Sequence, residues 1–247
     1  MNSNPGNPKD THLSELVHGA CLSYTNAEAL FREAKILSAH KAFSRALFLH
    51  QISLEECGKT EIIGWWTTAH LMGNAVDLGN MRSQLASHKD KNFANAYMLP
   101  LSESEQKARD ESDWKREHQA FKEQQIDFHQ ESNDRKNASL YVDFIDGVFF
   151  APNDHITEDM VHEIAERNYE FIELMRPKVE MFTRWNQNPA TARDSMMGFQ
   201  ELMERLRTEH PDHPQEAFDA LFGEMAAQQK NVQQPPVGDI PKAAPQE

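Results

Sequence analysis

The chain has few of the residues on which disulfide-bonded, zinc-binding or all-β proteins depend. Its 247 residues include two cysteines, Cys21 and Cys57, which form no C-x-x-C pair, and only ten glycines. Two separated cysteines suit a reducing compartment and provide no disulfide or metal framework. So few glycines argue against a fold built from many short strands and tight turns.

Targeting and membrane segments are not evident in the sequence. The polar residues 1–10 lack the apolar core of a signal peptide. The longest apolar-rich stretch, Ile62–Met72, is interrupted by Gly64 and Thr67 and is shorter than the roughly 18 residues that a membrane helix needs. We therefore expect a cytoplasmic protein without a membrane partner.

The chain also has an excess of acid over base, with a net charge of −14 and a pI near 5.3. Broad nucleic-acid binding depends on Lys and Arg, so this balance argues against it but still permits a small basic pocket that acts on RNA. No phosphate-binding glycine loop, H-E-x-x-H or G-x-S-x-G motif is present. We predict neither a cofactor nor a metal site.

The residues that are abundant (Ala, Leu, Glu, Lys, Gln and Met) favour helices, and we predict an all-α fold. Asn26 is a candidate N-cap for a helix over 27–40. A second helix over 42–71 is apolar nearly all round, which is typical of a central position in a bundle. Gly58 lies inside this helix, and a closely packed neighbour would explain its missing side chain.

The rest of the chain is predicted to be helical with few interruptions. Helices are expected over 81–97, over the highly charged 102–133, and from a Thr157 cap to about 184 with a possible kink at Pro177. Residues 148–150 are a candidate extended piece. The predicted organisation is a flexible arm (1–11), a helical domain (12–188), a C-terminal helical hairpin (189–229, with helices over 192–207 and 215–228) and a disordered tail (230–247).

Glu55, Glu56 and Lys59 form the first candidate site. Glu55 and Lys59 are four residues apart, in the favourable orientation for an ion pair within one helix. Alternatively, charged residues on a central helix need partners when buried, so the three side chains could build a polar site between helices.

His88, with Lys89, Asp90 and Lys91 beside it, forms the second candidate site. A histidine among charged residues is compatible with a solvated helix face. It can also serve as a proton-transfer group near neutral pH.

The third candidate is the segment from Arg135 to Asp143. Arg135 is a candidate phosphate-binding cation with the Tyr141 hydroxyl as its partner, although six residues along a regular helix place the two about 120° apart. In the alternative interpretation Tyr141 belongs to the core and Arg135 pairs with a surface acid.

Taken in order, the three segments resemble the AbiV family of abortive infection proteins, which belongs to the HEPN-like helical bundles. The similarity covers about residues 26–156. The residues that carry it are Asn26-Ala27, Ala42, Arg45-Ala46, Ser53-Leu54-Glu55-Glu56-Cys57-Gly58-Lys59 (resembling L-E-E-x-G-K), His88-Lys89-x-Lys91 (H-K-x-K), and Arg135-Lys136 through Ser139-Leu140-Tyr141-Val142-Asp143 (R-K-x-x-S-L-Y-V-D).

The resemblance implies a HEPN-like bundle that works as a homodimer in defence against phage. Many HEPN proteins are metal-independent ribonucleases that shut down translation, and AbiV-type proteins are also associated with recognising a phage protein. The implied catalytic residues are Arg135, Tyr141, His88 and Glu56, and the implied substrate-binding residues are Lys59, Lys89, Lys91, Lys136, Glu55 and Asp143.

Tyr141 departs from the nuclease pattern, because it stands where HEPN nucleases usually have His. Tyrosine, with a pKa near 10, is a poor general base at neutral pH. Three interpretations therefore stay open: an RNA-cleaving toxin in which His88 or Glu56 transfers the proton, a non-catalytic sensor or translation inhibitor, and a helical scaffold with no activity of its own. The second would bind its protein partner through the 102–133 helix or the C-terminal helices.

Overall fold

The computed structural model describes residues 8–210 and 220–221. The chain divides into two compact units, residues 1–196 and 197–247, and each is treated by itself. Apart from one short 3-10 turn and a two-stranded hairpin, every element in the described residues is an α-helix. The all-α prediction is confirmed. Within the described residues, no helix has both the length and the apolar character needed to cross a bilayer.

The first helix, α1 (Pro8–Ala39), begins much earlier than predicted. Asn26 was expected to cap this helix, but it lies within it. The residues that precede Asn26 carry buried apolar side chains at helical spacing, namely Leu13, Leu16, Val17, Ala20 and Tyr24. Burial of this stripe favours helix across the whole segment, so the predicted arm over 1–11 is wrong for residues 8–11. Residues 1–7 lie outside the described part.

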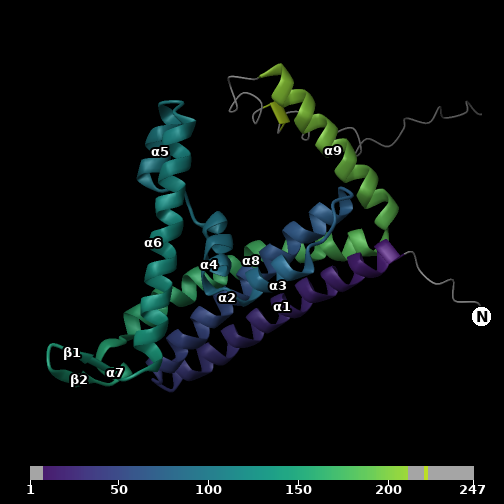
Figure 1. Cartoon of the computed structure of the whole chain (residues 1–247). Helices are drawn as coiled ribbons and strands as arrows, with labels where there is room; N and C mark the ends of the chain where they lie inside the picture. The colour runs from purple at the N-terminus through teal and green to yellow at the C-terminus, as the bar shows by residue number, and fades with distance from the viewer. Residues whose placement is uncertain (1–7, 211–219, 222–247) are drawn as a thin grey trace, which may run out of the picture. The chain divides into compact units, whose positions relative to one another are not determined.

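Helix α2 (Phe43–Leu71) is the centre of the first unit, as its all-round apolar sequence predicted. It lies beside α1 and α8 (Glu158–Gln187), and the three helices run alongside one another (Figure 1). Thr157 caps α8 as expected, with its hydroxyl accepting the backbone N–H of Met160. The helix continues through Pro177.

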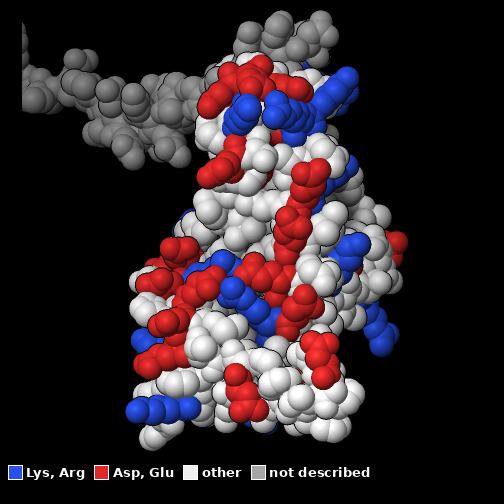
Figure 2. Space-filling model, turned by 90° about the vertical axis from the view of Figure 1, so that its left-hand side faces the viewer, with Lys and Arg blue, Asp and Glu red and all other residues white. Residues whose placement is uncertain are grey.

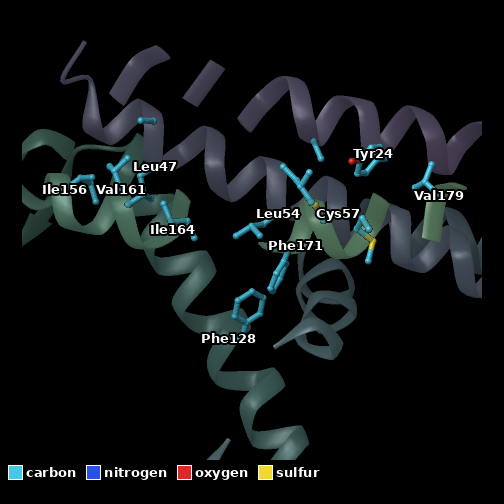
Figure 3. Packing of buried hydrophobic residues seen from close by; sticks show 14 residues of the cluster. Tyr24, Leu47, Leu54, Cys57, Phe128, Ile156, Val161, Ile164, Phe171 and Val179 are labelled. Carbon is cyan, nitrogen blue, oxygen red and sulfur yellow. The ribbon is translucent and has the colours of Figure 1, made fainter. Parts of the chain in front are cut away.

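One apolar cluster joins these three helices to α6 (Trp114–Leu140). Figure 3 shows Leu54 of α2 close to Phe171 of α8, and Phe128 of α6 turned toward the same point. The rings of Phe128 and Phe171 lie 6.4 Å apart between centroids. This contact anchors the middle of α6 against the central helices.

The region predicted as one helix over 81–97 is instead two helices, α3 (Leu78–Ala86) and α4 (His88–Asn95), followed by the 3-10 turn η1 (Ala96–Met98). Ser87 separates them. Its backbone is extended, and its hydroxyl accepts the N–H of Asp90 to cap α4. A serine cap therefore overrides the otherwise continuous helical pattern, and it places His88 at the first position of a new helix.

The charged segment 102–133 was predicted as one helix, and this too is wrong. Helix α5 (Glu103–Asp110) ends before Ser112, whose φ is +55°, and Asp113 caps α6. Helix α6 runs on to Leu140, beyond the predicted end. It leads into a β-hairpin of β1 (Asp143–Ile145) and β2 (Val148–Phe150), with Phe144 opposite Phe149. The extended piece expected over 148–150 is confirmed as β2, and α7 (Pro152–His155) follows it.

Helix α9 (Pro189–Glu209) contains the first of the two predicted C-terminal helices. The predicted partner helix over 215–228 falls almost wholly outside the described residues, and the predicted tail over 230–247 lies entirely outside them.

Gly58 is the point of closest approach between α2 and α4. A Cβ atom built there would lie 2.4 Å from the backbone oxygen of Lys91, which is much closer than two such atoms can approach. The carboxamide of Asn95 strengthens the same contact by donating to the backbone oxygen of Leu54 over 2.7 Å. The expectation that a close neighbour explains this glycine is confirmed.

Gly58→Ala should therefore destabilise the fold, although alanine is the better helix former by about 1 kcal/mol. Because the added methyl group forces α4 away from α2, the free energy of unfolding should fall by about 1–3 kcal/mol after the gain in helix propensity is counted. Urea unfolding measures this change. Gly19→Ala in α1 is the matched control, because its Cβ would meet only Ile63 Cδ1 at an ordinary 3.6 Å. The control should stabilise the protein, and equal effects in the two variants would contradict the packing argument.

Candidate functional site

The candidate site is built around the carboxylate of Glu55, in the middle of α2. The Nζ atom of Lys91 on α4 lies 2.7 Å from Glu55 Oε2, and Nζ of Lys136 on α6 lies 2.8 Å from Oε1. The three side chains are only 6%, 6% and 11% exposed. One carboxylate thus joins three helices and faces two ammonium groups, which leaves one excess positive charge in a largely buried position.

His88 completes this cluster at the surface. Its Nδ1 lies 2.7 Å from Glu55 Oε2, while its side chain is 56% exposed. Because an ionised carboxylate only accepts hydrogen bonds, Nδ1 donates to it, and in the neutral imidazole the lone pair then lies on Nε2. The carboxylate therefore sets both the tautomer and the orientation of an imidazole whose free nitrogen can accept a proton.

Glu55 stays ionised in this environment. Burial alone would raise the pKa of this carboxyl group, but hydrogen bonds and charge from Lys136 and Lys91 outweigh burial and lower it. The lysines thus allow a carboxylate to remain charged within a central helix.

A second imidazole, that of His129 on α6, lies beside the cluster. Its Nδ1 is 3.2 Å from the amide nitrogen of Asn92 on α4, so Nδ1 accepts and Nε2 carries the proton. Burial lowers the pKa of His129, and the charges on Lys89 and Lys136 lower it further. His129 is therefore a neutral hydrogen-bond donor at neutral pH. Sequence reasoning missed it, although His129 and Lys136 are seven residues apart and so share one helix face.

The structure brings only some of the predicted site residues together. Glu55, His88, Lys91 and Lys136 come into direct contact, and Lys89 lies next to them with its ammonium 5.0 Å from the ring centroid of Phe93. The predicted intrahelical pair of Glu55 with Lys59 is wrong, because Lys59 pairs with Glu56 and Glu55 turns toward the other helices.

Arg135, Tyr141 and Asp143 lie outside this cluster. Arg135 pairs with Glu131 and Glu163, as its alternative interpretation expected. Tyr141 is 62% exposed at the C-cap of α6, so the expectation that it belongs to the core is wrong. Asp143 opens β1, and its side chain accepts the backbone N–H of Phe144. Of the adjacent basic residues 135 and 136, the lysine is the one that reaches Glu55.

Acidic side chains dominate the surface on the α6 side of the molecule (Figure 2). A cavity of about 550 Å³ between α5, α6 and α8 is lined by Glu123, Asp127, Glu131 and Glu170, with Arg167 beside them. A polyanion is repelled from such a surface, which confines any contact with phosphate to locally basic places. Among the described residues, no group of three His, Cys, Asp or Glu side chains is arranged to hold a metal ion.

Glu55→Gln should destabilise the protein by about 3–5 kcal/mol, because it leaves Lys91 and Lys136 buried without a counter-charge. Glu117→Gln is the control, since it removes one partner of the more exposed pair with Arg109; it should cost less than about 1 kcal/mol. Urea unfolding at neutral pH measures both. Similar losses in the two variants would contradict the central role of Glu55.

Acid should have a corresponding effect. Because the pKa of Glu55 is lower in the folded protein, its contribution to stability is present above the ordinary value of 4.5 and is lost as the pH falls through the lowered value. The free energy of unfolding of Glu55→Gln should therefore fall less than that of the wild type as the pH is lowered from 6. Urea unfolding at a series of pH values measures the difference.

Comparison with known proteins assigns the chain to a family. The AbiV model of the HEPN domains matches residues 15–173, which is more than half of the chain and includes every member of the Glu55 cluster. An uncharacterized protein, y4gJ of Sinorhizobium fredii, is 42% identical over 98 residues, which cover 40% of this chain and 51% of that protein. The chain thus matches only about half the length of this relative. No solved structure matches. The extent of the family match shows that this chain belongs to the AbiV family of HEPN domains.

Proposed function

We propose that this AbiV-family protein acts in abortive infection as a metal-independent endoribonuclease that shuts down phage or host translation. The observation that carries the proposal is the hydrogen bond from His88 Nδ1 to Glu55, which leaves Nε2 of an exposed imidazole free to act as a base. The family membership supports the defence role, and the geometry of His88 supports the chemistry.

In the proposed reaction, His88 Nε2 takes the proton of a ribose 2′-hydroxyl. The resulting alkoxide attacks the adjacent phosphorus, the bond to the 5′-oxygen breaks, and a 2′,3′-cyclic phosphate forms. The departing oxygen takes a proton from solvent. Negative charge that develops on the phosphoryl oxygens is stabilised by the Lys89 ammonium, by the excess positive charge of the cluster and by the Nε2–H of His129.

Arg135 enters this proposal through a second copy of the chain. The HEPN resemblance implies that motifs from two protomers meet at a shared cleft, and Arg135 is turned away from Glu55 within its own protomer. A homodimer would give Arg135, and Tyr141 near it, a place at the partner's cluster. Dimerisation is thus part of the proposal, and sedimentation velocity measures it directly.

The test compares phage plating and total RNA after infection in cells that carry the wild type, His88→Gln or Arg135→Ala. His88→Gln should reduce RNA cleavage about 10²–10⁴-fold and abolish protection, and Arg135→Ala should abolish both. His118→Gln is the matched control for His88→Gln, because His118 is an exposed histidine on α6, outside the Glu55 cluster. Protection that survives in His88→Gln and Arg135→Ala would refute the site assignment.

A second candidate function, binding of a phage or host protein without catalysis, is favoured by the β-hairpin. Six apolar side chains of the segment 141–149 are between 44% and 73% exposed: Tyr141, Val142, Phe144, Ile145, Val148 and Phe149. Contiguous exposed apolar side chains typically mark a protein-binding surface. We therefore propose the hairpin as the protein-binding surface, in place of the 102–133 or C-terminal helices named from sequence.

Phe149→Ser distinguishes the two functions. Phe149 is 73% exposed, so the substitution should leave the melting temperature nearly unchanged. If the hairpin binds the protein partner, the variant should lose phage protection and fail to retain the partner that the wild type retains from infected-cell lysate. RNA cleavage by the purified protein should persist. Full protection by Phe149→Ser would exclude the hairpin as the essential contact.

A further inference from the structure

A small pocket lies beside Phe93, which also contacts His129 of the candidate site. It has a volume of about 180 Å³ and is lined by Ile62, Trp65, Gln84, Asp90, Phe93, Ala94, Tyr97 and Gln125. Pockets for drug-sized ligands usually measure 300–1,000 Å³, so this one suits a single small ring system. Its residues come from α2, α3, α4, η1 and α6, and all belong to the first unit.

Aromatic side chains form one part of this pocket. Trp65 and Tyr97 are 43% and 61% exposed, and their rings meet edge to face with centroids 5.6 Å apart. A planar ring that stacks on one of them would meet the edge or face of the other. Tyr97 also packs against Phe121, with centroids 4.8 Å apart. Partly exposed aromatic side chains are the usual stacking platforms for unpaired nucleic-acid bases.

Polar groups in the pocket present a defined set of donors and acceptors. The oxygen of Gln84 accepts from Trp66 Nε1, which leaves the Gln84 amide N–H groups as donors. The nitrogen of Gln125 donates to the backbone oxygen of Phe93, which leaves the Gln125 oxygen as an acceptor. Within the described part of the chain, no hydrogen bond or ion pair engages the Asp90 carboxylate.

This pattern complements guanine. Guanine presents two adjacent N–H donors, N1 and N2, beside the acceptor O6, and a carboxylate offers two acceptors at matching spacing. The other three RNA bases lack two adjacent donors on that edge. The Asp90 carboxylate can therefore accept from N1–H and N2–H, while the Gln84 amide donates to O6.

The position of the pocket connects it to the proposed chemistry. The ring of Phe93 lines the pocket and also meets His129 of the candidate site edge to face, with centroids 6.1 Å apart. The Lys89 ammonium lies 5.0 Å from the centroid of the same ring, where it can meet a phosphate. Asp90 and His88 both lie in the first turn of α4.

We propose that this pocket, with Asp90 as its base-reading residue, binds an unpaired guanine and so directs the protein to single-stranded RNA next to guanine. The inference rests on the proposed function for its biological meaning, since the base would place the neighbouring phosphate beside His88. Binding of the isolated base does not depend on cleavage, so the two proposals can fail separately.

The test is tryptophan-fluorescence titration of the full chain with guanosine 5′-monophosphate, and with the corresponding adenosine, cytidine and uridine nucleotides. The wild type should bind the guanosine nucleotide at least about tenfold more tightly than the others. Asp90→Asn should remove that preference, and Tyr97→Ala should weaken binding of all four nucleotides. Asp110→Asn, an exposed acid at the end of α5, controls for the change of charge.

Equal binding of the four nucleotides by the wild type, or an unchanged guanine preference in Asp90→Asn, would overturn the proposal. Should Asp90→Asn fail to fold, as judged by circular dichroism, the Tyr97→Ala titration and the wild-type nucleotide preference still decide it. Guanine binding without any RNA cleavage would refute the proposed nuclease activity and support the guanine pocket. RNA cleavage without a preference for guanine would refute the guanine pocket and support the nuclease activity.

Discussion

A single buried carboxylate, that of Glu55, is the constraint on which the site and much of the helix arrangement depend. Glu55 lies in a helix that is otherwise packed with apolar side chains, where an unpaired charge is very costly. It pairs with one lysine from α4 and another from α6, so both helices dock at this level of α2. Gly58 makes the approach of α4 sterically possible, and Asn95 adds a hydrogen bond to the same contact.

The same carboxylate links stability to chemistry. The contacts that keep Glu55 ionised also orient His88, so the structural and functional roles of this residue belong to one hydrogen-bond network. The network contains more positive than negative charge, in a chain whose net charge is −14. A polyanion would therefore meet a repulsive surface over much of the α6 side and a favourable field near His88 and Lys89.

Helix α6 carries two distinct surfaces. Its C-terminal half contributes His129 and Lys136 to the cluster, while Tyr141 at its C-cap leads into the apolar hairpin. The tyrosine at the position where HEPN nucleases usually have histidine is exposed beside that hairpin, some distance along the chain from the imidazoles of the cluster. The AbiV arrangement in this chain thus separates a proton-transfer geometry, built by α2 and α4, from a surface suited to protein contact. Both features fit the role in abortive infection that is proposed above.

The amino-acid sequence by itself determined the helical class, the central place of α2, the close neighbour of Gly58 and the choice of candidate segments that contain Glu55, His88, Lys91 and Lys136. These follow from local propensity, apolar periodicity and motif order, which the chain carries residue by residue. Only the tertiary structure decided that Glu55 turns away from Lys59, that Lys136 and not Arg135 reaches it, that His129 joins the cluster and that Tyr141 is exposed. Those outcomes depend on which helix faces meet, and long-range burial of charge selects them over the pairings that are nearest in sequence.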